Sequence, residues 1–182
     1  MNISLRSKIV QKLLNFFFIH KGERFYISEL SKLIEEEKSN INKQLLKLLE
    51  EGILSDEFKG NQHYFYINKN YRFLDEYETI IKKTFGIEAI LKDKLSSIKG
   101  INKAIIFGSY ASNTMKVDSD LDIMIVGTYD IKKVSQILVT LQKEWRLEIN
   151  SIEYSQKEYD KKLKVKDNFL INVLKNPIIN II

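Results

Sequence analysis

Residues 104–127, AIIFGSYASNTMKVDSDLDIMIVG, decide the fold of the second half of the chain. The stretch starts with an apolar run that ends at Gly108-Ser109, and a second apolar run, LDIMIVG, follows after a polar loop. Glycine permits a sharp turn and a close approach of the backbone to a ligand, so we expect a buried strand, a tight turn and a short helix. The free N–H groups at the start of such a helix suit a phosphate.

Two aspartates flank Leu121 where the second apolar run begins. Because side chains alternate along a strand, Asp120 and Asp122 project from one face, and Leu121 and Ile123 from the other. Two adjacent carboxylates repel each other, and a divalent cation between them removes the repulsion. We therefore predict that Asp120 and Asp122 bind a metal ion.

The composition restricts the metal and the chemistry. The chain of 182 residues has no cysteine and two histidines, His20 and His63, and 44% of its residues are hydrophobic. These numbers exclude disulfides, thiol nucleophiles and cysteine-ligated zinc, and they predict a folded protein with a core. A site built from carboxylates favours Mg²⁺ or Mn²⁺, which we expect as the cofactor.

The pattern Gly-Ser followed by Asp-x-Asp in a hydrophobic strand resembles the DNA polymerase beta-like nucleotidyltransferase superfamily. The resemblance covers residues 101–127 well and 128–176 loosely. It is closest to the minimal nucleotidyltransferases of bacteria and archaea, which resemble the core of kanamycin nucleotidyltransferase. It implies that the two aspartates bind two Mg²⁺ ions and that Gly108 and Ser109 hold a nucleoside triphosphate. The implied reaction transfers a nucleoside monophosphate to an acceptor hydroxyl and releases pyrophosphate.

The sequence departs from this family at a third position, where members supply another carboxylate from a later strand. That strand reads RLEINSIEYS, residues 146–155, in which Glu148 and Asn150 share a face and Asn150 stands where an aspartate is expected. Either Glu148 completes the catalytic and metal-binding set with Asp120 and Asp122, or the domain binds nucleotide with weak or no catalysis. We predict Glu148 as the third ligand.

The first 70 residues show helical periodicity followed by two short strands. Apolar spacings of three and four predict helices, with Ser28 as a possible N-cap for 29–37 and Ser39 or Asn40 for 41–52. ILSDEF and HYFYI then read as a hairpin around Lys59 to Gln62. Three helices and a hairpin in this order resemble a winged helix-turn-helix domain of the arsenic-repressor type.

The resemblance to a winged helix implies either binding to duplex DNA or a role in dimerisation or protein docking. A net charge of +5 permits contact with nucleic acid without requiring it. We predict the following DNA-contacting residues, from the third helix and the hairpin: Asn42, Lys43, Gln44, Lys47 and Lys59.

The chain is therefore predicted to be an α/β (α+β) protein with three parts. These are a winged helix-turn-helix over 1–70, a helical connector over 71–99 and a minimal nucleotidyltransferase domain over 100–182, in which Trp145, Phe107 and Phe169 belong to the core. Three functions stay open: a nucleotidyltransferase, a DNA-binding regulator whose degenerate transferase domain senses nucleotide, and an antitoxin. The partners expected are a nucleoside triphosphate, duplex DNA, a partner protein and a second copy of the chain.

The acceptor hydroxyl is undetermined and can belong to a protein, a small molecule or a nucleic acid 3′ end. The sequence shows neither a signal peptide nor an apolar run long enough to span a membrane. We therefore expect a cytoplasmic protein without membrane contact.

Overall fold

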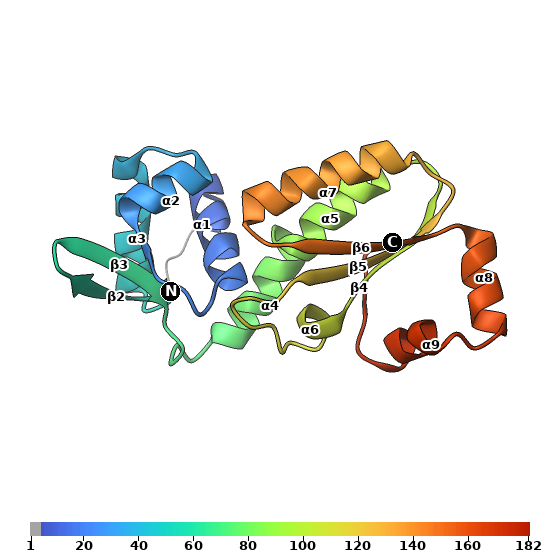
Figure 1. Ribbon diagram of the computed structural model, residues 1–182. Coiled ribbons are helices and arrows are strands. Elements are labelled where there is room, and N and C mark those ends of the chain that lie inside the picture. Colours follow the sequence, from blue (N-terminus) through green and yellow to red (C-terminus); the bar gives the residue numbers. More distant parts are fainter. Residues whose placement is uncertain (1–4) are drawn as a thin grey trace. The chain divides into compact units, whose positions relative to one another are not determined.

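The computed structural model describes residues 5–182, so the first four residues of the predicted 1–70 domain lie outside it. The fold is mixed α/β with two sheets, as predicted (Figure 1). The chain divides between Ile87 and Glu88 into two compact units. In residues 5–182, no helix has the length and apolar character that a membrane span requires.

From residue 5 onward, the first unit contains four helices and a small antiparallel sheet. The helices are α1 (Lys8–Ile19), α2 (Ile27–Ile34), α3 (Lys38–Glu50) and α4 (Leu74–Thr84). The strands are β1 (Phe25–Tyr26), β2 (Leu54–Lys59) and β3 (Gln62–Ile67), in the order β1-β3-β2. Lys59 pairs with Gln62, so the hairpin turn contains only Gly60 and Asn61 and is shorter than predicted.

Apolar side chains from every helix of the first unit meet in one core. Leu13, Phe17 and Leu45 are fully buried there. Tyr77 and Ile81 of α4 pack into the same core, so this helix is part of the first unit. The helices of the predicted connector, α4 and α5 (Ile87–Ser96), therefore pack in different units.

The predicted caps of the second and third helices are wrong. Helix α2 starts at Ile27, directly after β1, with Tyr26 at its N-cap, and α3 starts at Lys38 with Glu37 at its N-cap. Neither cap side chain bonds to the helix. Strand β1 was not predicted, and its pairing with β3 fixes the chain in an extended conformation up to Tyr26. Ser28 therefore lies inside the helix.

The second unit is built on a four-stranded mixed sheet. Its strands are β4 (Ile101–Phe107), β5 (Leu121–Gly127), β6 (Ile149–Tyr154) and β7 (Ile179–Asn180), in the order β6-β5-β4-β7. Strand β5 runs antiparallel to β4 and parallel to β6, and β7 pairs antiparallel with β4. The predicted strands over β4 and β5 are confirmed, whereas β7 was not predicted.

Helices cover both faces of this sheet. They are α5, α6 (Gly108–Ala111), α7 (Ile131–Trp145), α8 (Gln156–Lys164) and α9 (Asn168–Lys175). Ile105 and Met124 pack with Tyr159 of α8 and Leu170 of α9 in one core cluster. Side chains alternate along the strands, so the intervening residues point to the opposite face, which α5 and α7 cover (Figure 1).

Candidate active site

Three polar or aromatic side chains form a row across the sheet at one end of the strands. Asp122 on β5 lies opposite Phe107 on β4 and beside Asn150 on β6. Residues in register on neighbouring strands project from the same face, and here that face carries α8 and α9. Asp120, two residues before Asp122, extends the row into the loop that precedes β5.

Gly108 shapes the turn that leads from β4 into α6. Its φ is +73°, a conformation that residues with a Cβ rarely adopt. A Cβ at this position would overlap Asp122 Oδ2 and lie 3.3 Å from Asp122 Cγ. Glycine at 108 therefore lets the turn pass directly against the Asp122 carboxylate. The predicted close approach of this backbone to a ligand stays a prediction.

Asn150 holds the carboxylate pair together. Its Nδ2 donates to Asp120 Oδ2 over 3.1 Å. Burial raises the pKa of the Asp122 carboxyl above its usual value, and the negative charge of Asp120 raises it further; a hydrogen bond from the Asn150 side chain opposes the rise. The pair is thus a concentration of negative charge that one amide group compensates only in part.

Glu148 contributes to this region through its backbone. Its carbonyl oxygen accepts a hydrogen bond of 2.8 Å from the Leu121 amide, at the start of β5, and its side chain is exposed. Within residues 5–182, no three side chains of the types His, Asp and Glu come together as a metal-binding group. The structure therefore brings Asp120, Asp122 and Asn150 together, and the role of Glu148 stays a prediction.

The donor set fits a hard divalent cation. Asp122 on β5 and Asp120 in the loop before it supply oxygen ligands and negative charge, and the amide oxygen of Asn150 is a further ligand of the kind that Mg²⁺ and Mn²⁺ accept. The raised pKa of Asp122 also favours a cation here, because a cation would relieve the repulsion between Asp120 and Asp122 that raises this pKa in part. Asp120, Asp122 and Asn150 are the residues that would hold the ion.

The loop between α6 and β5 is tied to the Gly108 turn. The Ser112 hydroxyl donates to the Gly108 carbonyl over 2.9 Å, and the Thr114 amide donates to the Ser109 carbonyl over the same distance. Ser109 is the second residue of α6, half-buried beside the turn. The predicted nucleotide-binding pair, Gly108 and Ser109, therefore lies next to the carboxylates.

Of the three residues predicted in the core, only Trp145 is buried there, with 4% of its surface exposed. Phe107 is partly buried, and Phe169 of α9, which is 41% exposed, meets it edge to face with ring centroids 6.0 Å apart. The prediction for Phe169 is wrong because Leu170 and Val173 bury the inner side of α9. The register between β4 and β5, which the sequence does not give, places Phe107 beside Asp122.

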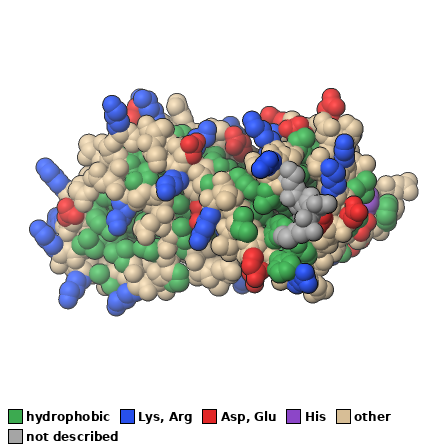
Figure 2. Space-filling model, turned by 180° about the vertical axis from the view of Figure 1, so that it is seen from behind, with side chains coloured by type: hydrophobic (Ala, Val, Ile, Leu, Met, Phe, Trp, Pro, Cys, Tyr) green, Lys and Arg blue, Asp and Glu red, His purple; other side chains and the backbone are tan. Residues whose placement is uncertain are grey.

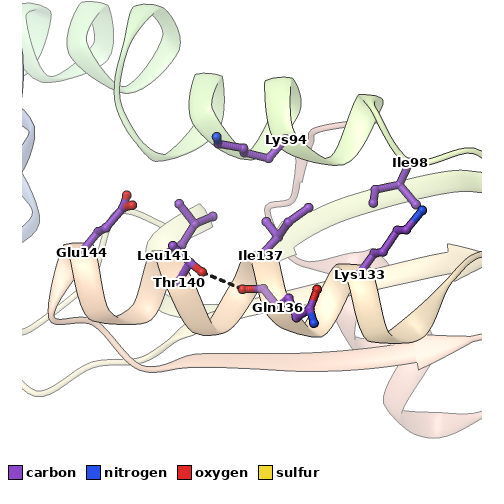
Figure 3. Close-up of a pocket in the computed structure, with 8 residues that line it drawn as sticks. All are labelled: Lys94, Ile98, Lys133, Gln136, Ile137, Thr140, Leu141 and Glu144. Atoms are coloured by element: carbon purple, nitrogen blue, oxygen red, sulfur yellow. Dashed lines mark hydrogen bonds between the residues drawn. The ribbon is translucent and has the colours of Figure 1, made fainter.

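A groove of about 330 Å³ lies between α5 and α7 (Figure 3). Lys94 lines it from α5, and α7 contributes residues from Lys133 to Glu144. Both helices lie on the face of the sheet away from Asp122 (Figure 1). The groove is therefore separate from the candidate active site.

The predicted DNA-contacting residues belong to the first unit. Ile41, Leu45 and Leu48 bury one side of α3. The predicted set lies on its other side and at the hairpin: Asn42, Lys43, Lys47 and Lys59 are exposed, and Gln44 is half-buried. Figure 2 shows Lys and Arg side chains spread over the face that it draws, with Asp and Glu among them.

Comparison with known proteins identifies the second unit. The family described as "Nucleotidyltransferase domain" matches residues 87–179, about half of the chain, so the chain belongs to this family. The chain is also similar to a protein of Methanocaldococcus jannaschii named "Putative protein adenylyltransferase". The two are 33% identical over 81 residues, which cover 42% of this chain and 81% of that protein.

Solved structures show weaker likeness. A chain from "a putative nucleotidyltransferase from Sulfolobus solfataricus" is 22% identical, with a TM-score of 0.29 over 41% of this chain and 68% of that one. A chain from a "toxin-antitoxin with AMP-PNP" is 17% identical, with a TM-score of 0.39 over 52% and 72%. "Reduced HlyU from Vibrio cholerae" is 12% identical, with a TM-score of 0.34 over 41% and 76%. At these values the likeness supports no statement about function.

Proposed function

We propose that the protein is a divalent-metal-dependent nucleotidyltransferase. It moves a nucleoside monophosphate from a nucleoside triphosphate to an acceptor hydroxyl and releases pyrophosphate. The observation that carries this proposal is the pair Asp120 and Asp122 at the start of β5, of which Asp122 packs against the Gly108 turn. Membership of the nucleotidyltransferase family supports it independently.

Each residue of the row has a role in this reaction. Asp120 and Asp122 would hold Mg²⁺ or Mn²⁺, which neutralises charge on the phosphates when bound. The Gly108–Ser109 turn places the phosphate chain, and Asn150 fixes the orientation of Asp120 through its 3.1 Å hydrogen bond. The acceptor oxygen bonds to the α-phosphorus as the bond from that phosphorus to the α–β bridging oxygen breaks, pyrophosphate leaves, and the proton of the acceptor hydroxyl passes to solvent. Glu148 is the predicted third ligand.

We further propose that the nucleotide is ATP and that the acceptor is a hydroxyl of a protein. The name of the Methanocaldococcus jannaschii relative supports both choices, because it describes adenylyl transfer to protein. The acceptor would be a partner protein, or a second copy of the chain in a homodimer. The second unit consists of one sheet and the helices that cover it, and we assign no part of it to binding an acceptor. We therefore propose that a separate polypeptide brings the hydroxyl to Asp122.

The first unit is, in our proposal, a winged helix-turn-helix that targets the enzyme to duplex DNA or forms a dimer. The order of three helices and an antiparallel hairpin, with β1 beside β3, supports this. Lys43 and Lys47 lie one turn apart on the exposed side of α3 and would contact phosphates or base edges. In the part of the chain described, neither lysine pairs with a carboxylate.

The position of the label distinguishes nucleotidyl transfer from phosphoryl transfer. Purified protein with Mg²⁺ is incubated with cleared cell extract and ATP labelled at either the α- or the γ-phosphate. Kinases of the extract label proteins from the γ-phosphate, so the extract alone sets the background. We expect the labelling that depends on the added protein to come from the α-position only, and the double variant Asp120→Asn/Asp122→Asn, while folded, to add none. Added labelling from the γ-position, or equal added labelling by the variant, would contradict the proposal.

The presence of Asn150 favours a second candidate function. It supplies an amide where family members have a third carboxylate, and a site with one fewer charge can bind nucleotide without turning it over. The protein would then be a DNA-binding regulator, or an antitoxin, whose transferase domain senses nucleotide. This candidate predicts ATP binding without α-label transfer to any protein, together with duplex binding that weakens as salt rises.

A further inference from the structure

An aromatic pair lies beside the carboxylate pair. Phe107 is the last residue of β4 and Phe169 the second residue of α9, and their rings meet at 80° with centroids 6.0 Å apart. Phe107 packs partly into the core beneath α8 and α9, whereas Phe169 is 41% exposed. The underside of the pair is thus supported by the core, and part of the Phe169 ring faces solvent.

The pair is adjacent to the residues proposed to bind phosphate and metal. Phe107 is in register with Asp122 across β4 and β5, on the same face of the sheet. It also directly precedes Gly108, whose turn touches the Asp122 carboxylate. A ligand whose phosphates lie at Gly108 and Asp122 would therefore have the Phe107–Phe169 pair next to it.

Phe169 is held in place without being buried itself. Asp167 caps α9: its Oδ1 accepts from the Leu170 amide over 3.0 Å, and its Oδ2 pairs with Lys162 over 3.0 Å. Leu170 and Val173 anchor the helix, with 0% and 5% of their surfaces exposed. The exposed ring is thus positioned by its neighbours, which lowers the entropy cost of binding a flat ligand against it.

We infer that Phe169 is the platform on which the base of the bound nucleoside triphosphate stacks, next to the phosphates at Gly108 and Asp122. The inference rests on the proposed nucleotide site and adds a subsite for the base. Every nucleobase has a flat face that stacks on an aromatic ring, and loss of such a ring lowers affinity by about 5- to 150-fold. The triphosphate, which lies against the turn, does not need Phe169.

The test compares two probes, ATP and inorganic tripolyphosphate, each titrated with Mg²⁺ into the full-length protein by calorimetry. Phe169→Ala is expected to bind ATP about 5- to 150-fold more weakly and tripolyphosphate as the wild type does. Phe58→Ala, which removes another exposed phenylalanine, 72% exposed on the hairpin of the first unit, serves as the matched control and should bind both probes unchanged.

A second variant keeps an aromatic ring in place and reports on it. Phe169→Trp retains the platform, and because the only natural tryptophan, Trp145, is 4% exposed, the new indole dominates changes in fluorescence at the surface. Its emission should change when ATP binds and stay constant when tripolyphosphate binds. Unchanged emission with bound ATP would overturn the inference.

The outcomes separate the base platform from the nucleotide site. If Phe169→Ala binds ATP as tightly as the wild type, or loses both probes equally while folded, the base platform is overturned and the nucleotide site is not. If the wild type binds neither probe, the proposed function fails and the platform fails with it. Loss of ATP binding alone supports both.

Discussion

Replacing Gly108 by alanine tests the packing of the turn against Asp122. The added methyl group would occupy the space of Asp122 Oδ2, so either the turn or the carboxylate must move. The backbone conformation, with a φ of +73°, is also less favourable for a residue that carries a Cβ, which lowers the stability of the folded state. Both effects act at the point where we place the nucleotide and the metal ion.

The magnitude follows from these two contributions. A left-handed conformation costs an alanine about 1–2 kcal/mol, and overpacking adds about 1–3 kcal/mol. The lower entropy of the unfolded alanine chain returns about 0.4–1 kcal/mol. We therefore expect Gly108→Ala to lower the free energy of unfolding of the second unit by about 1–5 kcal/mol, and a loss of about 2 kcal/mol corresponds to a Tm lower by about 10 °C.

Gly60→Ala is the matched control. Gly60 also has a positive φ, +60°, but a Cβ there would meet nothing within 4 Å. Only the backbone contribution remains, so we expect a loss of about 1 kcal/mol, confined to the first unit. Calorimetry measures both transitions, and Trp145, the single tryptophan, reports the second unit by fluorescence.

The same variants separate stability from function. In Gly108→Ala the methyl group displaces Asp122, one of the two proposed charged ligands of the metal ion. The Mg²⁺-dependent affinity for ATP should then fall by on the order of tenfold, about 1.4 kcal/mol, whereas Gly60→Ala should leave it unchanged. If Gly108→Ala melted like Gly60→Ala and bound ATP like the wild type, the close contact between the turn and Asp122 would be refuted.

Three further predictions follow from other contacts. Asn150→Asp removes the hydrogen bond to Asp120 and adds a negative charge, so without metal the variant should melt at a lower temperature than the wild type. Added Mg²⁺ should raise the melting temperature of the variant more than that of the wild type, and equal rises would contradict this. Lys43→Ala/Lys47→Ala should weaken duplex binding and make the negative slope of log affinity against log salt less steep by about 2; an unchanged slope would argue against α3 as the DNA-contacting helix. The hydrogen bond to Leu170 and the ion pair with Lys162 hold the pKa of Asp167 below its usual value, so its contribution to stability is present above the pKa of an unfolded aspartate and is lost as pH falls through the lower folded value. Asp167→Ala should remove this pH dependence from acid melting curves, and curves that fall in parallel with the wild type would contradict the assignment.

The chemically informative part of the site was predictable because it depends on short-range patterns. Strand alternation placed Asp120 and Asp122 on one face, and a Gly-Ser pair after an apolar run indicated the turn. Asn150 was singled out by the family resemblance, which implies an aspartate at that position, and strand alternation only placed it on one face with Glu148. The structure adds the register between strands, which pairs Asp122 with Asn150 and Phe107.

The features that sequence reasoning missed depend on contacts between distant segments. Strand β1 has two residues and exists because β3 pairs with it, and β7 exists because β4 does. The start of α2 at Ile27 follows from the pairing of β1, so Ser28 gave the wrong boundary. Helix α3 starts at Lys38, one residue before the predicted cap Ser39. Phe169 is exposed because its neighbours Leu170 and Val173 supply the buried side of α9, which composition does not reveal.

The central claim is that Asp120 and Asp122 form a metal-dependent nucleotide site. Calorimetric titration of ATP into the wild type and into Asp122→Asn, each with Mg²⁺ and with EDTA, tests it most directly. We predict that the wild type binds ATP with Mg²⁺, that EDTA abolishes binding and that Asp122→Asn, although folded, binds much more weakly. Binding that is the same in the variant, or that does not depend on the metal, would contradict the account.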